Sequence, residues 1–405
     1  MRYYQITVTD QDANVLVQST NPRDGFSLSQ DLPASTWTSL NAGMSVDQLG
    51  STNYAAQRIE VDLTATPLHA PDAKAKPYVK IHGVTLPQIS SASNLNGKFV
   101  AIYGGMAKGL PLANPQQAGL LVAGQIQQCI GNWIGVEQSL TLYVIPGGSA
   151  SAYNQAANGQ TLDTPVTPTS PANLIFQWSK GQSLVSAILQ TLNNAFPQLG
   201  IAGAISTQLV WGSDVPKTAY FQTLQQFAQF VHETSVSVLA GPAPANNTYG
   251  FSINTPYQGV TMTLQGGIIT LFDSSTQTNP IQIGFNDMIG QPTWGAPGKV
   301  QLTTVMRGDI SVGDFVQLPP TVGVTLQGAY SQSGVSPFNT PFQDNSAFAG
   351  VFLVQKCRHV GDSRNADGTA WVSVFELAFQ QPAQQTVAGF PSIYKGAGNV
   401  YGFKS

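Results

Sequence analysis

The sequence predicts a mainly β protein of the α+β class, in which two antiparallel β-barrel domains flank a small α/β domain with two helices. Three observations support this expectation. Short runs rich in β-branched and aromatic residues alternate with Gly, Pro and Asn turns over residues 1–165. Apolar residues recur at three- and four-residue steps in the middle of the chain, as they do in helices. Short β-rich runs return after residue 290.

The first domain is expected over residues 1–165. Many short strands separated by frequent turns are typical of an antiparallel sandwich or barrel. The dipeptide Asn96-Gly97 precedes one of the β-rich runs and predicts a tight hairpin turn with positive φ. The runs that we expect to form strands are Tyr3–Val8, Arg58–Leu63, Tyr78–Ile81, Phe99–Tyr103 and Leu140–Ile145.

A connection rich in Gly, Ser and Pro over residues 146–172 marks the boundary to the α/β domain, expected over 166–289. A helix is expected to begin near Ser183 and to stop at Pro197. A second helix is expected over residues 221–233, followed by a strand at 235–239. Further strand signals at 268–272 and 281–285 complete this domain.

The second barrel is expected over residues 290–385, with β-rich runs at 300–306, 351–360 and 371–379. The segment Arg307–Leu318 predicts a strand, a turn at Gly313-Asp314 and a second strand. The prolines at 319 and 320 lack N–H donors and should end that strand. Residues 386–405 carry aromatic side chains without a core-forming period, and we expect an extended C-terminal tail that docks onto a neighbouring protein.

The composition points to burial against partner proteins. Hydrophobic residues make up 42% of the chain but charged residues only 9%, and the net charge is −3. So little charge gives a free monomer weak protection against association. With no Lys/Arg cluster we expect no specific nucleic-acid recognition. With no signal peptide and no apolar run of spanning length, we expect folding in a cytoplasm and no stable membrane insertion.

Residue types that carry chemistry are present but not grouped. The histidines at 69, 82, 232 and 359 are scattered, and the cysteines at 129 and 357 are expected to be buried free thiols. Cys357 and His359 share one strand face and could begin a metal site, although a packed face is the favoured interpretation. Asp362–Gly368 lacks the full ligand pattern of a calcium loop and is expected to be a hairpin turn at Asp367-Gly368.

No nucleotide-binding, hydrolase or carboxylate-pair arrangement stands out either, and the Gly-rich stretches at 104–109 and 396–402 are expected to be loops. We therefore expect a protein without catalytic residues, metal or cofactor.

Several segments together resemble the baseplate hub proteins of Mu-like tailed bacteriophages. They are 289–294 (Ile-Gly-Gln-Pro-Thr-Trp), 306–319 (Met-Arg-Gly-Asp-Ile-Ser-Val-Gly-Asp-Phe-Val-Gln-Leu-Pro), 359–362 (His-Val-Gly-Asp), and 114–145 with its Asn-Pro-Gln-Gln-Ala-Gly start. The residues that carry the resemblance in the C-terminal third are Trp294, Arg307, Asp309, Gly313, Asp314, His359, Gly361, Asp362 and Trp371.

The resemblance implies a homotrimer whose chains each contribute two tube-like barrels, giving a pseudo-sixfold ring with a channel for genome passage. Such a ring joins a hexameric tail tube to a trimeric central spike or tail-tip protein and contacts other baseplate proteins. The implied location is the tail baseplate of a virion.

The main alternative is a carbohydrate-binding or host-attachment β-protein, because exposed aromatics such as Trp133, Trp178 or Trp211 could stack on sugars. A secreted hydrolase is a third interpretation, which would need an export signal and an acid/base pair.

Overall fold

The protein is described here from a computed structural model. The structure describes residues 2–10, 12, 14–19, 21, 23–29, 35–72, 76–109, 113–147, 167–170, 172–197, 199–240, 257–273, 279–296, 299–319, 350–380 and 387–389. Among the described helices, none has both the length and the apolar character needed to cross a lipid bilayer.

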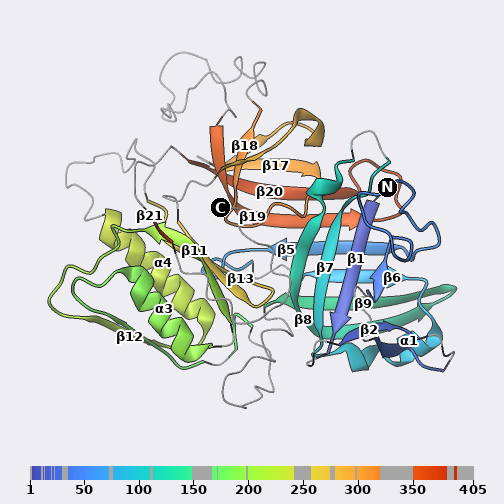
Figure 1. Ribbon diagram of the computed structural model, residues 1–405, viewed down its shortest axis with the longest axis horizontal. Coiled ribbons are helices and arrows are strands. Elements are labelled where there is room, and N and C mark those ends of the chain that lie inside the picture. The colour runs from blue at the N-terminus through green and yellow to red at the C-terminus, as the bar shows by residue number, and fades with distance from the viewer. Residues whose placement is uncertain are drawn as a thin grey trace.

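A long antiparallel sheet runs through most of the molecule (Figure 1). Its strands follow the order β16-β17-β20-β19-β5-β6-β9-β8-β7-β1-β2-β3, with β4, β15 and β18 paired at its sides. The N-terminal β unit consists of β1 Arg2–Thr9, β2 Val15–Gln18, β3 Phe26–Ser29, β4 Trp37–Thr38, β5 Ile59–Ala65, β6 Tyr78–His82, β7 Phe99–Met106, β8 Gly119–Ile134 and β9 Glu137–Pro146. The C-terminal β unit consists of β15 Ile281–Gln282, β16 Thr293–Ala296, β17 Lys299–Val305, β18 Phe315–Leu318, β19 Gly350–Asp362 and β20 Trp371–Gln380.

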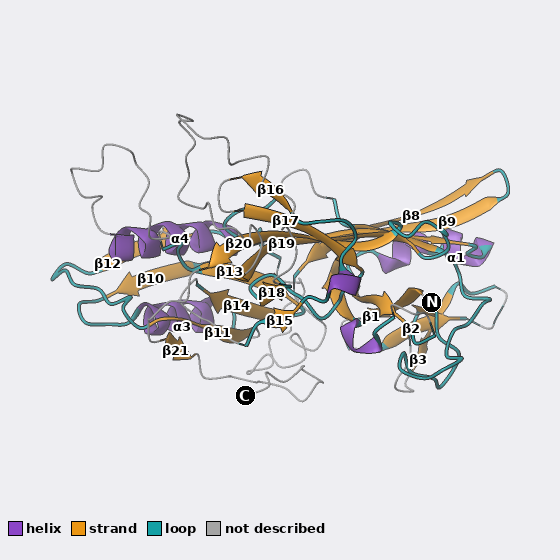
Figure 2. Cartoon of the chain, turned by 90° about the horizontal axis from the view of Figure 1, so that it is seen from above, coloured by secondary structure: helices purple, strands orange, loops and turns teal. Residues whose placement is uncertain are grey.

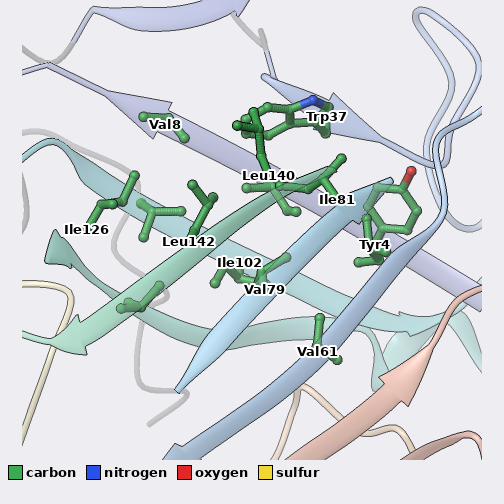
Figure 3. Packing of buried hydrophobic residues seen from close by; sticks show 14 of the residues in the cluster. Tyr4, Val8, Trp37, Val61, Val79, Ile81, Ile102, Ile126, Leu140 and Leu142 are labelled. Carbon is green, nitrogen blue, oxygen red and sulfur yellow. The ribbon is translucent and has the colours of Figure 1, made fainter. Parts of the chain in front are cut away.

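The two β units share this sheet because β5 pairs with β19. The strand path remains open from β16 to β3, so the described strands confirm a mainly β fold but not two closed barrels. The N-terminal sheet nevertheless curls around its own core. Figure 3 shows side chains from several strands converging there, among them Tyr4, Val61, Ile81, Ile102 and Leu142.

The α/β unit lies beside the β units at one end of the molecule (Figures 1 and 2). Helix α3 (Leu184–Ala195) begins after Ser183, whose hydroxyl accepts a hydrogen bond from the Ser186 N–H, as expected for an N-cap. Its apolar face and helix α4 (Leu224–Ala240) pack on a core that includes Phe176, Trp178 and Phe227. The strands here are β10 Leu174–Trp178, β11 Gly200–Ser206, β12 Lys217–Phe221, β13 Thr261–Gln265, β14 Ile268–Phe272 and β21 Val387–Gly389.

The strand expected at 235–239 is wrong, because these residues form the last turns of α4. The Ser-Val-Ser-Val alternation fits a strand, but in the helix Val238 and Leu239 still pack against the core of the α/β unit. Ser235 bonds the carbonyl of His232 and receives the N–H of Val260, so its hydroxyl is satisfied within a helix.

Smaller expectations also differ from the structure. The Gly-rich stretch 104–109, expected to be a loop, belongs to β7 as far as Met106. The strand signal at 281–285 gives only the two-residue β15, which pairs with β18 of the C-terminal β unit and not with the α/β unit. Gly97 has the expected positive φ of 79°, but it follows a 3-10 turn (Ala92–Leu95) and does not close a hairpin. The segment before the Gly313 turn is not a strand, since β17 ends at Val305 and the chain reaches β18 through turns. The 16-residue strand β8 and the short helix α1 (Leu86–Ser90) were not anticipated.

The expected C-terminal tail is described only at β21, which pairs with β11 of the same chain. Most of the expected connection at 146–172 and the Gly-rich stretch at 396–402 lie outside the described residues.

Candidate functional site

The candidate site is the junction where the two β units meet, because most residues that carry the sequence resemblance lie there. Strands β5 and β19 run antiparallel from Cys357 opposite Ala65 to Asp362 opposite Glu60. The alternation of a strand places odd-numbered residues of this pair on the core side and even-numbered ones on the other face. Ile59, Val61 and Leu63 are buried accordingly.

Charged side chains cross the junction on its outer face. Arg358 donates two hydrogen bonds to the Asp62 carboxylate, from Nε at 2.8 Å and from Nη2 at 2.6 Å. Lys356 lies 2.7 Å from the Asp72 carboxylate and 3.8 Å from Glu376. A one-residue slip of β19 against β5 would point these side chains into the core, so the pairs favour this register.

Arg58 neutralises a like-charge pair at the same junction. Glu60 and Asp362 are directly opposite each other, an arrangement that is unfavourable for two carboxylates. The Arg58 guanidinium contacts both, at 2.7 Å from Glu60 and 2.8 Å from Asp362. Partial burial opposes ionisation of Asp362, but the Arg58 hydrogen bond and further donors prevail and lower the pKa of this carboxyl.

Trp371 extends from the C-terminal β unit into the core of the N-terminal unit. It is buried among the side chains of that core, and its indole N–H donates to the Gly105 carbonyl at 2.9 Å. Gly361 is its cross-strand neighbour. A Cβ at Gly361 would come within 2.3 Å of the indole ring, so this position accepts the tryptophan only because it is glycine.

Arg307 forms the most buried charged cluster in the described structure. Its side chain is only 3% exposed and bonds the Asp309 carboxylate from Nε at 2.9 Å and from Nη2 at 2.5 Å. Its Nη1 lies 3.1 Å from Asp287, which also accepts hydrogen bonds from the Gly284 N–H and the Gln117 amide. Gln117 belongs to the N-terminal unit, so the cluster links both units.

The backbones of the two units also touch beside this cluster. The Gly308 N–H donates to the Gln117 carbonyl at 2.9 Å. A Cβ at either Gly119 or Gly308 would come within 2.4 Å of the other residue's carbonyl oxygen, so the close approach requires two glycines. The cluster borders a polar depression whose wall also contains the exposed Phe285.

A line of buried polar groups runs inward from Arg307. Ser373 accepts the Arg307 N–H at 2.9 Å and lies 2.8 Å from His359 Nδ1, while His359 Nε2 lies 3.2 Å from the Cys357 thiol. Burial lowers the pKa of His359 to about 4 and raises the pKa of Cys357 well above its ordinary value. Both groups are therefore neutral at pH 7 and sealed from solvent, so this Cys–His–Ser line packs the strand face.

The loop after β19 binds the side chain of Arg2 from β1. Its turn residues cap their own backbone, as Asp367 does for the Thr369 N–H at 2.9 Å. The guanidinium of Arg2 donates to the carbonyls of Asp362, Asn365 and Asp367. These carbonyls therefore hold an arginine, and β19 and β20 join here as a hairpin, as expected from the sequence.

The remaining predicted residues lie around the junction. Gly313 has φ of 101° and faces the Phe272 ring of the α/β unit. Asp314 accepts the Ser311 N–H, and burial raises the pKa of its carboxyl to about 6. Trp294 lies on β16 and is 38% exposed.

The tryptophans of the attachment alternative differ from one another. Trp178 is completely buried and packs against Trp211, so it cannot stack on a sugar. Trp133 is 62% exposed.

Cysteine and metal expectations can be compared with the described residues. Both Cys129 and Cys357 are buried free thiols, as expected. Within the described ranges, His, Cys, Asp and Glu form no group of three that could hold a metal ion.

Sequence reasoning missed several residues of the junction. Asp287 and Gln117 complete the Arg307 cluster, Ser373 continues it, and Asp62 and Arg358 pair across 296 residues. No local spacing connects such partners. The one signal in the sequence is the scarcity of charge. Because only 9% of the residues are charged, a charged residue within a β-rich run is a candidate for an ion pair with another such residue.

Comparisons with known proteins give weak structural similarities. No family model and no curated protein sequence matches the chain. A tail protein from Neisseria meningitidis MC58 is 10% identical, with a TM-score of 0.40, covering 93% of this chain and 96% of its own. A 43 kDa tail protein of prophage MuSo2 from Shewanella oneidensis is 7% identical, with a TM-score of 0.40 and coverages of 93% and 98%. A PdpA-VgrG complex in a lidless form is 6% identical, with a TM-score of 0.38 and coverages of 95% and 66%.

Proposed function

We propose that this chain is a structural protein of a bacteriophage tail, the baseplate hub. In this role three copies form a pseudo-sixfold ring that joins the hexameric tail tube to the trimeric central spike or tail-tip protein. The ring leaves a channel for genome passage and contacts other baseplate proteins at its periphery. The proposed location is the baseplate of the virion tail.

One observation carries the proposal. Several of the residues through which the sequence resembles hub proteins lie where the two β units join into one continuous sheet. Trp371 fills the core of the N-terminal unit, Asp362 pairs with Arg58, and Asp287, which is bound by Arg307, accepts a hydrogen bond from Gln117 of the N-terminal unit. Cross-unit pairing and ion pairs suit a rigid adaptor that must transmit force without changing shape.

We further propose that the chain has no enzymatic role. His359 contacts two nucleophilic side chains at the junction, Cys357 and Ser373, but all three are buried, and the imidazole and the thiol are neutral. The carboxylates of Asp287 and Asp309 are occupied by Arg307 and by backbone or amide donors. Groups held in this way stabilise a structure and are poorly placed to attack a substrate.

The attachment alternative has one observation in its favour, the exposed indole of Trp133. An exposed aromatic ring can stack on a sugar. Glycan binding that disappears in Trp133→Ala, in a protein that remains monomeric, would support attachment over the hub.

Native mass spectrometry of the purified full chain tests the proposal. A hub should give a species of three times the 42.9 kDa chain mass, either alone or after addition of the candidate tube and spike proteins. A protein that stays monomeric and binds neither the tube nor the spike protein at micromolar concentration would overturn the hub role.

A further inference from the structure

The hairpin formed by β8 and β9 projects beyond the rest of the sheet, as Figure 2 shows. The pairing of β7 with β8 reaches only Gln125, and the pairing of β6 with β9 stops at Ser139. Helix α1 still covers the hairpin at Gly131, where a Cβ would come within 3 Å of Ile89. Beyond the Asn132–Ser139 pair the two strands have only each other as strand partners.

The projecting end of this hairpin, the tip, carries exposed apolar side chains. Trp133 is 62%, Ile134 75% and Val136 99% exposed. The tip bends at Gly135, whose φ is 61°, and the Trp133 indole N–H donates to the Gly135 carbonyl at 2.9 Å. The indole is therefore held over the turn by a defined hydrogen bond. Large apolar side chains gathered on a projecting element are typical of an interaction site.

A second exposed apolar surface lies on the ribbon of β10 and β12. Ile175 and Tyr220 are directly opposite each other on its outer face and are 66% and 58% exposed. Their neighbours on that face, Gln177 and Thr218, are exposed and uncharged. The inner face is occupied, since Phe176 and Trp178 pack into the core of the α/β unit.

The tip and the ribbon lie at opposite ends of the longest axis of the molecule (Figures 1 and 2). They cannot meet within one chain. Two different apolar surfaces at opposite ends of one molecule fit a head-to-tail contact, in which one copy uses its tip and the next copy its ribbon. Contacts of this heterologous kind close into rings when the rotation between copies allows it.

We propose that the tip of the β8–β9 hairpin docks on the outer face of the β10–β12 ribbon of a second copy of this chain. The proposed contact depends on the proposed hub function only for the number of copies in the ring. The two apolar surfaces themselves are features of the structure. Glu137 is the one charged residue at the tip, and the four outward residues of the ribbon named above are uncharged, so a largely apolar protein surface is the favoured occupant. A membrane surface would be favoured by Lys and Arg near the apolar residues, whereas residues 127–136 contain neither.

Cysteine cross-linking in the full-length protein tests the contact. Val136→Cys and Tyr220→Cys each place a thiol on an exposed site, while the native Cys129 and Cys357 are buried. We expect a disulfide-linked dimer on mild oxidation when the two single variants are mixed, and none from either variant alone. Leu49→Cys, also exposed, replaces Tyr220→Cys in the control mixture and should give no cross-link.

Different outcomes test the tip-to-ribbon contact and the proposed trimeric ring separately. A dimer from Val136→Cys alone would show tip-to-tip association and overturn the proposal. Tip-dependent sedimentation with phosphatidylcholine–phosphatidylglycerol vesicles, without cross-links, would overturn it in favour of lipid.

A native trimer that forms no cross-link would refute this contact and leave the hub role intact. Cross-links in the double variant that extend past three copies would support the contact and refute the closed trimer. As a second readout, Val136→Ser with Ile134→Ser should raise the dissociation constant of the assembly by about tenfold or more, as loss of a central anchor does.

Discussion

Replacing Arg307 by methionine should destabilise the protein strongly, because it removes the cation that two carboxylates share. The Arg307 side chain is 3% exposed, and Asp287 and Asp309 are 15% and 24% exposed. Breaking a buried ion pair by removing one partner costs about 3–5 kcal/mol, since the remaining charge is left uncompensated. Both carboxylates keep some contact with water, so we expect about 3 kcal/mol, at the lower end of this range.

Arg358→Met is the matched control, because it removes an arginine with a similar two-bonded partner, Asp62, at an exposed position. The side chain of Arg358 is 51% exposed, and exposed pairs contribute under about 1 kcal/mol. Arg307→Lys keeps the charge but cannot form the two parallel bonds to Asp309, so its effect should be intermediate.

Urea denaturation at pH 7, followed by tryptophan fluorescence, gives the free energy of unfolding for each variant. Hydrogen exchange adds a local readout, since the Gly284 N–H donates to Asp287 and the Gly308 N–H to the neighbouring Gln117 carbonyl. Both amides should exchange faster in Arg307→Met. If Arg307→Met costs no more than Arg358→Met, burial does not strengthen this cluster and the reasoning fails.

Three further predictions concern packing, pH and charge at the junction. Gly361→Ala should lower the free energy of unfolding by about 1–3 kcal/mol, because the added methyl group collides with Trp371, and it should change the near-UV circular dichroism. Gly368→Ala, where the methyl group meets open space, should do neither. Equal effects of the two variants would contradict the packing argument. The pKa of His359 is about 4 in the folded protein against 6.5 when unfolded, so the unfolded state binds more protons and stability falls as the pH drops from 6.5 to 4. His359→Asn should reduce the pH dependence of the urea midpoint across this window, and an unchanged slope would rule out a contribution from His359. Arg58→Ala should leave Glu60 and Asp362 opposed, so its destabilisation should shrink at 1 M salt to roughly that of Lys180→Ala, which breaks an exposed pair; a salt-independent loss would exclude this repulsion.

Elements with a strong local signal could be predicted from the sequence. Helix α3 has a cap at Ser183 and an apolar period that Pro197 ends, so its limits follow from local chemistry. Strand β14 was expected at its observed position because its apolar run is short and lies between Gly267 and Asp273. The end of α4 could not be predicted, since its Ser-Val alternation satisfies a strand pattern and a helix face equally well.

The candidate site could be predicted only in its parts. The resemblance singled out Arg307, Asp309 and Trp371, but the partners of Arg307 and Trp371 come from distant segments of the chain. Asp287, Gln117 and Gly105 have no sequence pattern that connects them to those residues. Their roles depend on which strands pair, and pairing between strands far apart in sequence is set by the whole fold.

The pairing of β5 with β19 also has a consequence for how the chain folds during synthesis. Arg358, the partner of Asp62, is synthesised 296 residues later. At a translation rate of about 5–20 residues per second this delay lasts roughly 15–60 s. During that time β5 is an open sheet edge, the kind of surface on which chains aggregate. Glu60 and Asp62 are charged side chains on this edge, a feature that opposes edge-to-edge pairing of strands, so we expect the residues that fix the register in the folded protein also to limit aggregation before β19 is made.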